Sequence, residues 1–155
     1  MNGADIKRIL QKDWNVRRVF RGVFACDTLP VYVNRGQAHA FIINIDPHYK
    51  PGSHWVALYI DYFGAATYFD SFGLEPYIPS IRNFILRNSF KWTHNSCSLQ
   101  SPFSTTCGLY CIFFISNICR GDRLLDILHH FHLQNPIINE RRIIALTSSL
   151  SIQHD

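Results

Sequence analysis

The spacing of apolar and polar residues changes several times along the chain, and each change predicts a boundary between elements. Apolar residues recurring at helical spacing, as at Ile6, Ile9 and Leu10, predict amphipathic helices. The stretch from Cys107 to about Ile118 is apolar nearly all round, which is typical of a buried helix. The predicted helices span residues 4–14, 77–88, 107–118, 123–133 and 136–150.

Segments rich in aromatic and β-branched residues predict the strands. These segments are residues 38–46, 54–61, 65–73 and, with looser alternation, 89–100. The turn at Asp61–Gly64 joins the second and third strands into a hairpin. The order of elements predicts an α+β fold with a mostly antiparallel central sheet flanked by helices. No repeat, low-complexity stretch or linker interrupts the sequence, so we expect a single domain over residues 1–155.

Composition narrows the class of protein. Apolar residues make up 47% of the 155 residues and charged residues 17%, which excludes a disordered chain. The apolar run after Cys107 is broken at Ser116 and Asn117, too early to span a bilayer, and the N-terminal residues have no signal-peptide pattern. The odd number of cysteines, five, favours free thiols. We therefore expect an intracellular protein in a reducing compartment, with no membrane partner.

The net charge of +4 permits contact with phosphate or nucleic acid, although a solvated basic surface is the simpler interpretation. The basic clusters are Lys7/Arg8/Lys12, Arg17/Arg18/Arg21, Arg120/Arg123 and Arg141/Arg142.

One cysteine stands where a loop meets an apolar helix, in the stretch QSPFSTTCGLYC. Thr105 or Thr106 can cap that helix, which places Cys107 in its first turn, where the helix dipole lowers a thiol pKa. Gly108 leaves space beside the sulfur for a substrate backbone, and the N–H of Cys107 can stabilise an oxyanion. Taken alone, Cys107 is equally well interpreted as an inert core residue.

A cysteine nucleophile needs a base, and His54 is the histidine with a suitable partner. It begins one strand of the predicted hairpin, and Asp70 ends the other, so the hairpin brings imidazole and carboxylate together. Gln100 precedes Cys107 by seven positions, and its amide can donate to an oxyanion. Each of these residues alone has a structural interpretation; together they favour catalysis.

The motifs GSHWVALYI, YFDSFG and QSPFSTTCGLYC resemble those of the adenain family, the adenovirus-type cysteine endopeptidases, within the clan that includes proteases of ubiquitin-like modifiers. The family order of His, acid, Gln and Cys is present. The resemblance implies that His54 is the general base, Asp70 the orienting acid, Gln100 the oxyanion donor and Cys107 the nucleophile at the N-terminus of the buried helix. Trp55 matches the aromatic neighbour of the base, as a cation–π partner or as a wall of the site.

The sequence departs from the family pattern in two respects. The acid is Asp70, where adenovirus enzymes typically carry Glu and modifier proteases Asp, and the chain is shorter after the nucleophile helix. The separation of seven between Gln100 and Cys107 matches adenains rather than the six of modifier proteases. Thr106 stands where modifier proteases usually carry Asp. The adenain-like interpretation is therefore favoured.

The resemblance implies processing of viral precursor polypeptides at Gly-containing sites, in the virion or the infected nucleus. It also implies activation by a short viral peptide, which adds a strand at the sheet edge, and by DNA. Cys97, on the predicted strand before the site, is a candidate disulfide anchor for that peptide, with a buried free thiol as the alternative. Two other functions stay open: a deconjugating protease for ubiquitin-like modifiers, and a catalytically silent DNA-associated protein.

The histidines of HHFH, at positions 129, 130 and 132, raise the question of a metal. No paired Cys-x-x-Cys spacing accompanies them, so we assign no metal site and no small-molecule cofactor.

Overall fold

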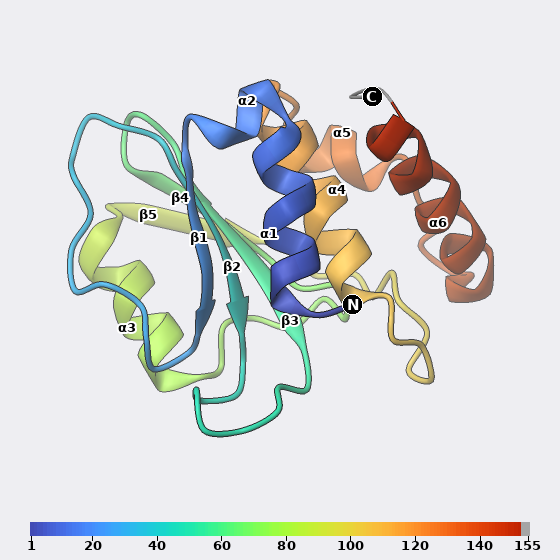
Figure 1. Cartoon of the computed structure of the whole chain (residues 1–155), viewed down its shortest axis with the longest axis horizontal. Coiled ribbons are helices and arrows are strands. Elements are labelled where there is room, and N and C mark those ends of the chain that lie inside the picture. Colours follow the sequence, from blue (N-terminus) through green and yellow to red (C-terminus); the bar gives the residue numbers. More distant parts are fainter. Residues whose placement is uncertain (153–155) are drawn as a thin grey trace.

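The computed structural model describes the backbone of residues 1–152 and the side chains through residue 150. Its elements follow one another along the chain as Figure 1 shows. They are α1 (Gly3–Lys12), α2 (Trp14–Arg17), β1 (Phe20–Ala25), β2 (His39–Asn44), β3 (Trp55–Ile60), β4 (Ala65–Phe69), α3 (Pro79–Asn88), β5 (Lys91–His94), α4 (Cys107–Cys119), α5 (Leu124–Leu128) and α6 (Pro136–Ile152).

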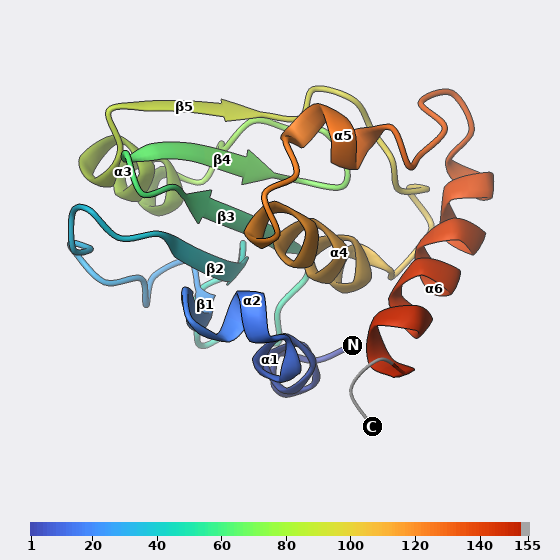
Figure 2. The same cartoon turned by 90° about the horizontal axis from the view of Figure 1, so that it is seen from above.

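The five strands form one sheet in the order β1-β2-β3-β4-β5, and in Figure 2 they follow one another from β5 at the top to β1 at the bottom. β2–β3 and β3–β4 are antiparallel, whereas β1–β2 and β4–β5 are parallel. The α+β prediction is confirmed, but the prediction of a mostly antiparallel sheet is wrong, because the sheet is mixed. Alternation of apolar residues predicts that a strand exists, while its direction depends on the connection. The loop 26–38 and helix α3 carry the chain back to pair in parallel.

The two faces of the sheet bury two separate cores, as alternating side chains of a strand must. On β2 and β3, Ile42 and Ala57 face one core, and Phe41 and Leu58 face the other. The first core also contains α1 and α4, and the second contains α3. In Figures 1 and 2, α3 accordingly lies on one side of the sheet, and α1 and α4 lie on the other.

Helix α4 is buried on most of its sides, as its sequence predicted. It packs on β3 of the sheet and contacts α1, α2, α5 and α6. Phe114 of α4 stacks on Phe69 at the end of β4, with ring centroids 4.8 Å apart and planes 9° apart. Because this packing fixes α4 against the sheet, the first residue of the helix, Cys107, lies near the end of the sheet where β3 begins and β4 ends.

Several predicted elements are shorter than expected, among them the strand predicted for 65–73, which ends at Phe69. The helix predicted for 123–133 ends at Leu128, because Phe131 turns back into the core and packs on Tyr110 and Phe113. The strand predicted within 89–100 is limited to Lys91–His94. No helix within residues 1–152 has the length and apolar character needed to cross a membrane.

Candidate active site

The β3–β4 hairpin brings His54 and Asp70 into contact. His54 immediately precedes β3 and Asp70 immediately follows β4, and the register pairs Ala57 with Phe69. Nε2 of His54 lies 2.8 Å from Oδ1 of Asp70. Asp70 is fully buried and His54 is 8% exposed, so this contact is shielded from solvent. The structure thus brings together the pair that the sequence predicted.

Asp70 is held in place by its neighbours. Its Oδ1 also accepts from the backbone N–H of Phe72 at 2.9 Å. Its own backbone is clamped by Asn95, whose Oδ1 accepts from Asp70 N at 3.0 Å and whose Nδ2 donates to Asp70 O at 2.5 Å. The second carboxylate oxygen, Oδ2, has no partner among the described residues. Asn95 was not identified from the sequence, because a buried Asn after a strand carries no distinctive motif.

Cys107 is the first residue of α4, and its sulfur lies in the same cavity as the His54 imidazole. Nε2 of His54 contacts Asp70, which leaves Nδ1 to face the sulfur. Burial by itself lowers the imidazole pKa, but the hydrogen bonds to Asp70 and Cys107 outweigh it and raise the pKa of His54 to about 9. These contacts therefore favour the charged form of the imidazole.

The pKa of the Cys107 thiol shifts in the opposite direction. Burial alone would raise its pKa, but hydrogen bonds from His54 and from the backbone N–H groups of Trp55 and Gly108 lower it. Burial raises the pKa of Cys97 and Cys111, and raises that of Cys119 to about 12. Cys107 is thus the cysteine in which the thiolate is stabilised.

Gln100 lies in the same cavity, and both ends of its amide are anchored. Oε1 accepts from Ser71 Oγ at 2.6 Å, and Nε2 donates to the carbonyl of Ser104 at 2.9 Å. A primary amide has two N–H donors, so one remains for a ligand. Ser71, which follows Asp70 directly, was not identified from the sequence.

The site opens into a cavity of about 890 Å³. Cys107, His54, Gln100, Trp55 and Phe72 contribute to its lining. Phe72 stacks on the His54 ring with centroids 4.8 Å apart and planes 29° apart. Trp55 lies on the wall and donates from Nε1 to Met1 O at 3.3 Å. Of the two roles considered for Trp55, the geometry favours the wall, and Phe72 is the ring that covers the imidazole.

The surroundings of Gly108 differ from those that the sequence predicted. A Cβ built there would lie 3.2 Å from Ile6 Cδ1 and 3.5 Å from Met1 Sδ and Trp55 Cδ1. The space beside Gly108 is thus filled by protein rather than open to a substrate backbone. Gly108 instead permits close packing of the chain start and α1 on α4, and its N–H reaches the Cys107 sulfur.

The predicted side-chain cap of α4 is also wrong. Thr106 is the N-cap residue, but its hydroxyl makes no capping hydrogen bond. Its O–H donates to Oε2 of Glu140 at 2.6 Å, a charge-assisted hydrogen bond that turns the hydroxyl toward α6. Thr105 is exposed at the rim of the cavity.

Two further sequence hypotheses concern residues outside this cavity. Cys97 follows β5 rather than lying on it, is half-buried against the first core, and is a free thiol. His130 packs edge-on against Phe113, with ring centroids 5.3 Å apart. Within residues 1–152, no three His, Cys, Asp or Glu side chains lie close enough together to hold a metal ion.

A thiol at the start of a buried helix, facing an imidazole that a buried carboxylate orients, defines a site of the cysteine-peptidase type. The chain belongs to the adenovirus endoprotease family, whose model matches residues 20–140.

Individual relatives agree with this assignment. The chain is 32% identical to the protease of bovine adenovirus 7 and 30% identical to that of bovine adenovirus 4. Each match spans 110 residues and covers 62% of this chain and 54% of the relative, so the chain matches about half the length of these relatives. The solved structure of ChlaDub1 from Chlamydia trachomatis has the same fold, with a TM-score of 0.55 at 14% identity, over 96% of this chain and 76% of that one.

Proposed function

We propose that this protein is a viral cysteine endopeptidase in which Cys107 is the nucleophile, His54 the general acid and base, Asp70 the orienting acid and Gln100 an oxyanion donor. The observation that carries the proposal is the series Asp70–His54–Cys107, in which the buried Asp70 contacts His54 and His54 lines one cavity with Cys107, with the pKa of the imidazole raised and that of the thiol lowered. These opposite shifts favour a thiolate–imidazolium pair, the reactive form of a cysteine peptidase.

In the acylation step, the Cys107 thiolate attacks the scissile carbonyl carbon, and the carbonyl oxygen takes the negative charge. The free N–H of Gln100 and the backbone N–H of Cys107 stabilise that oxygen. His54 then donates its proton to the amide nitrogen as the C–N bond breaks. The products are a thioester on Cys107 and a free amine.

In the deacylation step, neutral His54 removes a proton from water, whose oxygen attacks the thioester carbonyl. The C–S bond breaks, the acid product leaves, and the Cys107 thiolate and His54 imidazolium are restored. Asp70 holds the ring so that Nδ1 faces the sulfur, and it stabilises the positive charge of the imidazolium.

The substrates we propose are viral precursor polypeptides cleaved at Gly-containing sites, in the virion or the infected nucleus. Membership of the adenovirus endoprotease family supports this class of substrate. The cavity of about 890 Å³ beside Cys107 has room for several residues of an extended peptide.

The test is cleavage of quenched fluorescent peptides with Gly-containing sites and of a virion precursor, by wild type and by Cys107→Ala. We expect cleavage by wild type and none by the variant. A parallel reaction with modifier-conjugated protein addresses the deconjugating protease, and release of modifier without precursor cleavage would overturn the proposal. Absence of both reactions with DNA and activating peptide present would leave the silent DNA-associated protein as the function.

We also propose that DNA and a viral peptide stimulate the reaction. Arg8, Arg120 and Arg123 already form ion pairs with acidic side chains, which reduces their value as phosphate ligands. Arg17, by contrast, lies 4.2 Å from the ring of exposed Trp14, a basic and aromatic pairing suited to nucleic acid. The expected result is a DNA stimulation that weakens with salt and is reduced in Arg17→Ala.

Strand addition by the activating peptide requires an open sheet edge, and within residues 1–152 β1 and β5 are the edge strands. Burial raises the pKa of Cys97, which disfavours the thiolate needed for a disulfide with the peptide. We therefore expect Cys97→Ser to retain peptide stimulation. Loss of stimulation in that variant would establish Cys97 as the anchor.

A further inference from the structure

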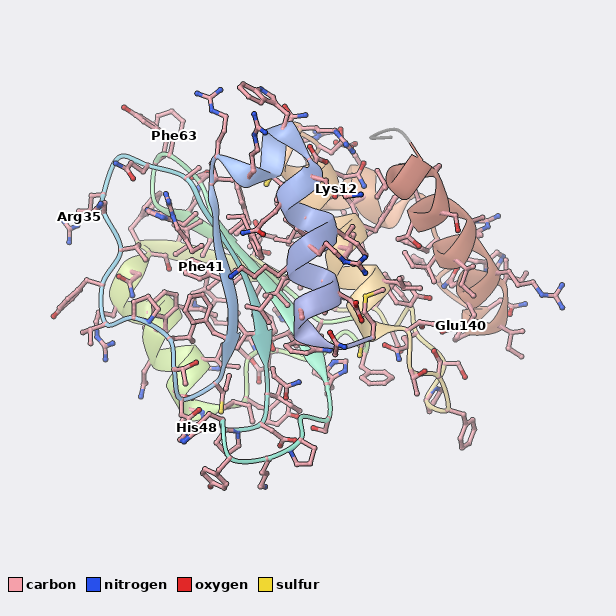
Figure 3. The ribbon with its side chains drawn as sticks, viewed as in Figure 1. Lys12, Arg35, Phe41, His48, Phe63 and Glu140 are labelled. Atoms are coloured by element: carbon pink, nitrogen blue, oxygen red, sulfur yellow. The ribbon has the colours of Figure 1, made fainter. Side chains whose placement is uncertain are left out.

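The loop between Gln100 and Cys107 is held from outside the site by α6. Glu140 of this helix, labelled in Figure 3, is half-buried. Its carboxylate accepts three hydrogen bonds from the loop. The donors are Ser101 N to Oε1 at 3.0 Å, Ser104 Oγ to Oε2 at 2.7 Å and Thr106 Oγ1 to Oε2 at 2.6 Å. Both carboxylate oxygens are used, and the donors lie at the beginning, middle and end of the loop.

The residue before Glu140 holds the start of the same segment. Asn139 is fully buried, and its Nδ2 donates to Leu99 O at 3.1 Å and to His132 O at 2.8 Å. Its Oδ1 accepts from His132 N at 2.7 Å. Because Leu99 immediately precedes Gln100, the first turns of α6 fix both ends of the segment that carries the oxyanion donor and the nucleophile.

We propose that Glu140 is a positioning residue of the proposed peptidase: it sets the place of Gln100 and Cys107 relative to His54 through the loop between them. This inference rests on the proposed function. The chemical link is short, since Gln100 Nε2 donates to Ser104 O and Ser104 Oγ donates to Glu140. At the other end, Thr106 donates to Glu140 and Cys107 follows it directly.

The loop needs such a clamp because its own sequence does not order it. Phe103, at its middle, is 97% exposed, and Thr105 is also exposed, so little apolar burial fixes the loop. Charge-assisted hydrogen bonds to the half-buried carboxylate of Glu140 hold the loop in place of apolar burial. A displacement of about 1 Å in a catalytic group can reduce turnover on the order of a hundredfold, so the clamp has kinetic consequences.

The test compares Glu140→Gln with the control Glu75→Gln. Glu75 is the other glutamate of the chain, and it is exposed and distant from Glu140 in the sequence. We expect Glu140→Gln to lower kcat about tenfold per active site, with active sites counted by a thiol probe, and to leave KM little changed. A merely structural role would instead reduce the number of titrated sites. Unchanged kcat per site, matching Glu75→Gln, would overturn the proposal.

A second readout does not depend on turnover: the pH midpoint for alkylation of Cys107 by iodoacetamide. Removal of a negative charge by itself would lower the thiol pKa or leave it unchanged. Loss of alignment with His54 raises it, so we expect the midpoint to rise in Glu140→Gln. A midpoint that falls or stays constant would contradict the positioning role. If wild type alkylates rapidly but cleaves nothing, the proposed function fails while this measurement still decides the role of Glu140.

A double-mutant cycle with Gln100→Ala tests whether Glu140 acts through Gln100. If Glu140 acts by placing Gln100, Glu140→Gln should cost less in the Gln100→Ala background than in wild type. Full additivity of the two losses would overturn action through Gln100. Should Glu140→Gln fail to fold, Ser104→Ala removes one of the three donors and undergoes the same measurements, with the same direction of change expected.

Discussion

His54 Nε2 lies 2.8 Å from Asp70 Oδ1 in a contact from which solvent is nearly excluded. The contact commits Nε2 to the carboxylate, so the ring presents Nδ1 to the Cys107 sulfur. A hydrogen bond at one imidazole nitrogen therefore determines the chemistry at the other.

The first prediction concerns pH. In wild type, cleavage should rise with pH as the Cys107 thiol ionises and fall as the His54 imidazolium deprotonates near pH 9. In Asp70→Asn the charge and hydrogen bond that raise the imidazole pKa are lost, so the alkaline limb should move to lower pH. We also expect kcat to fall on the order of 10⁴-fold, as for the orienting acid of a catalytic triad. The pH dependence of kcat/KM is the measurement.

The matched control for that profile is Asp61→Asn, at the turn between β3 and β4, on the opposite end of the hairpin. Its alkaline limb should coincide with that of wild type. An Asp70→Asn profile with an unmoved alkaline limb would show that Asp70 does not control the His54 pKa.

The second prediction concerns thiol selectivity. Cys107 should be the first of the five cysteines to react with iodoacetamide near neutral pH, because its pKa is lowered while burial raises those of Cys97, Cys111 and Cys119. Peptide mass spectrometry after a short pulse identifies the labelled residue. In His54→Ala the rate at Cys107 should fall markedly, since the hydrogen bond that lowers the thiol pKa is removed. Faster labelling of Cys97 in wild type would contradict the assignment.

The sequence predicted the contact between His54 and Asp70 because it depends on local information: two strands, a tight turn and antiparallel pairing. It also predicted the buried helix α4, whose apolar character on all sides follows from its position between the sheet and other helices. Strand β1 was not predicted, and the parallel pairings of β1 and β5 could not be predicted either, since alternation carries no direction.

Residues that support the site were missed for a related reason. Asn95 and Glu140 act through hydrogen bonds to partners that lie 25 and 34 or more positions away. A polar residue near a strand end or in a helix has the same local pattern whether it meets solvent or a buried partner. Such contacts depend on how whole elements pack, which residue spacing does not specify.

The third prediction concerns stability. Asn95 is 1% exposed, and its amide bonds the backbone N–H and carbonyl of Asp70 and the carbonyl of Cys97. Asn95→Ala leaves these buried groups unpaired, so we expect the free energy of unfolding to fall by roughly 1–3 kcal/mol. Urea denaturation measures the change, with the exposed Asn34→Ala as the control that should stay near wild type. An equal effect in both variants would show that the Asn95 clamp adds nothing.

The fourth prediction separates the oxyanion donor from its support. Gln100→Ala removes an N–H aimed at the charge that develops in the transition state, so kcat should fall on the order of 10²–10³ with KM little changed. Ser71→Ala removes only the hydroxyl that donates to Gln100 Oε1 at 2.6 Å, so its effect should be smaller and in the same direction. Steady-state kinetics per titrated site measures both, with the exposed Ser80→Ala as control. If Gln100→Ala retained the wild-type kcat, the backbone N–H of Cys107 and other donors would have to stabilise the oxyanion without it.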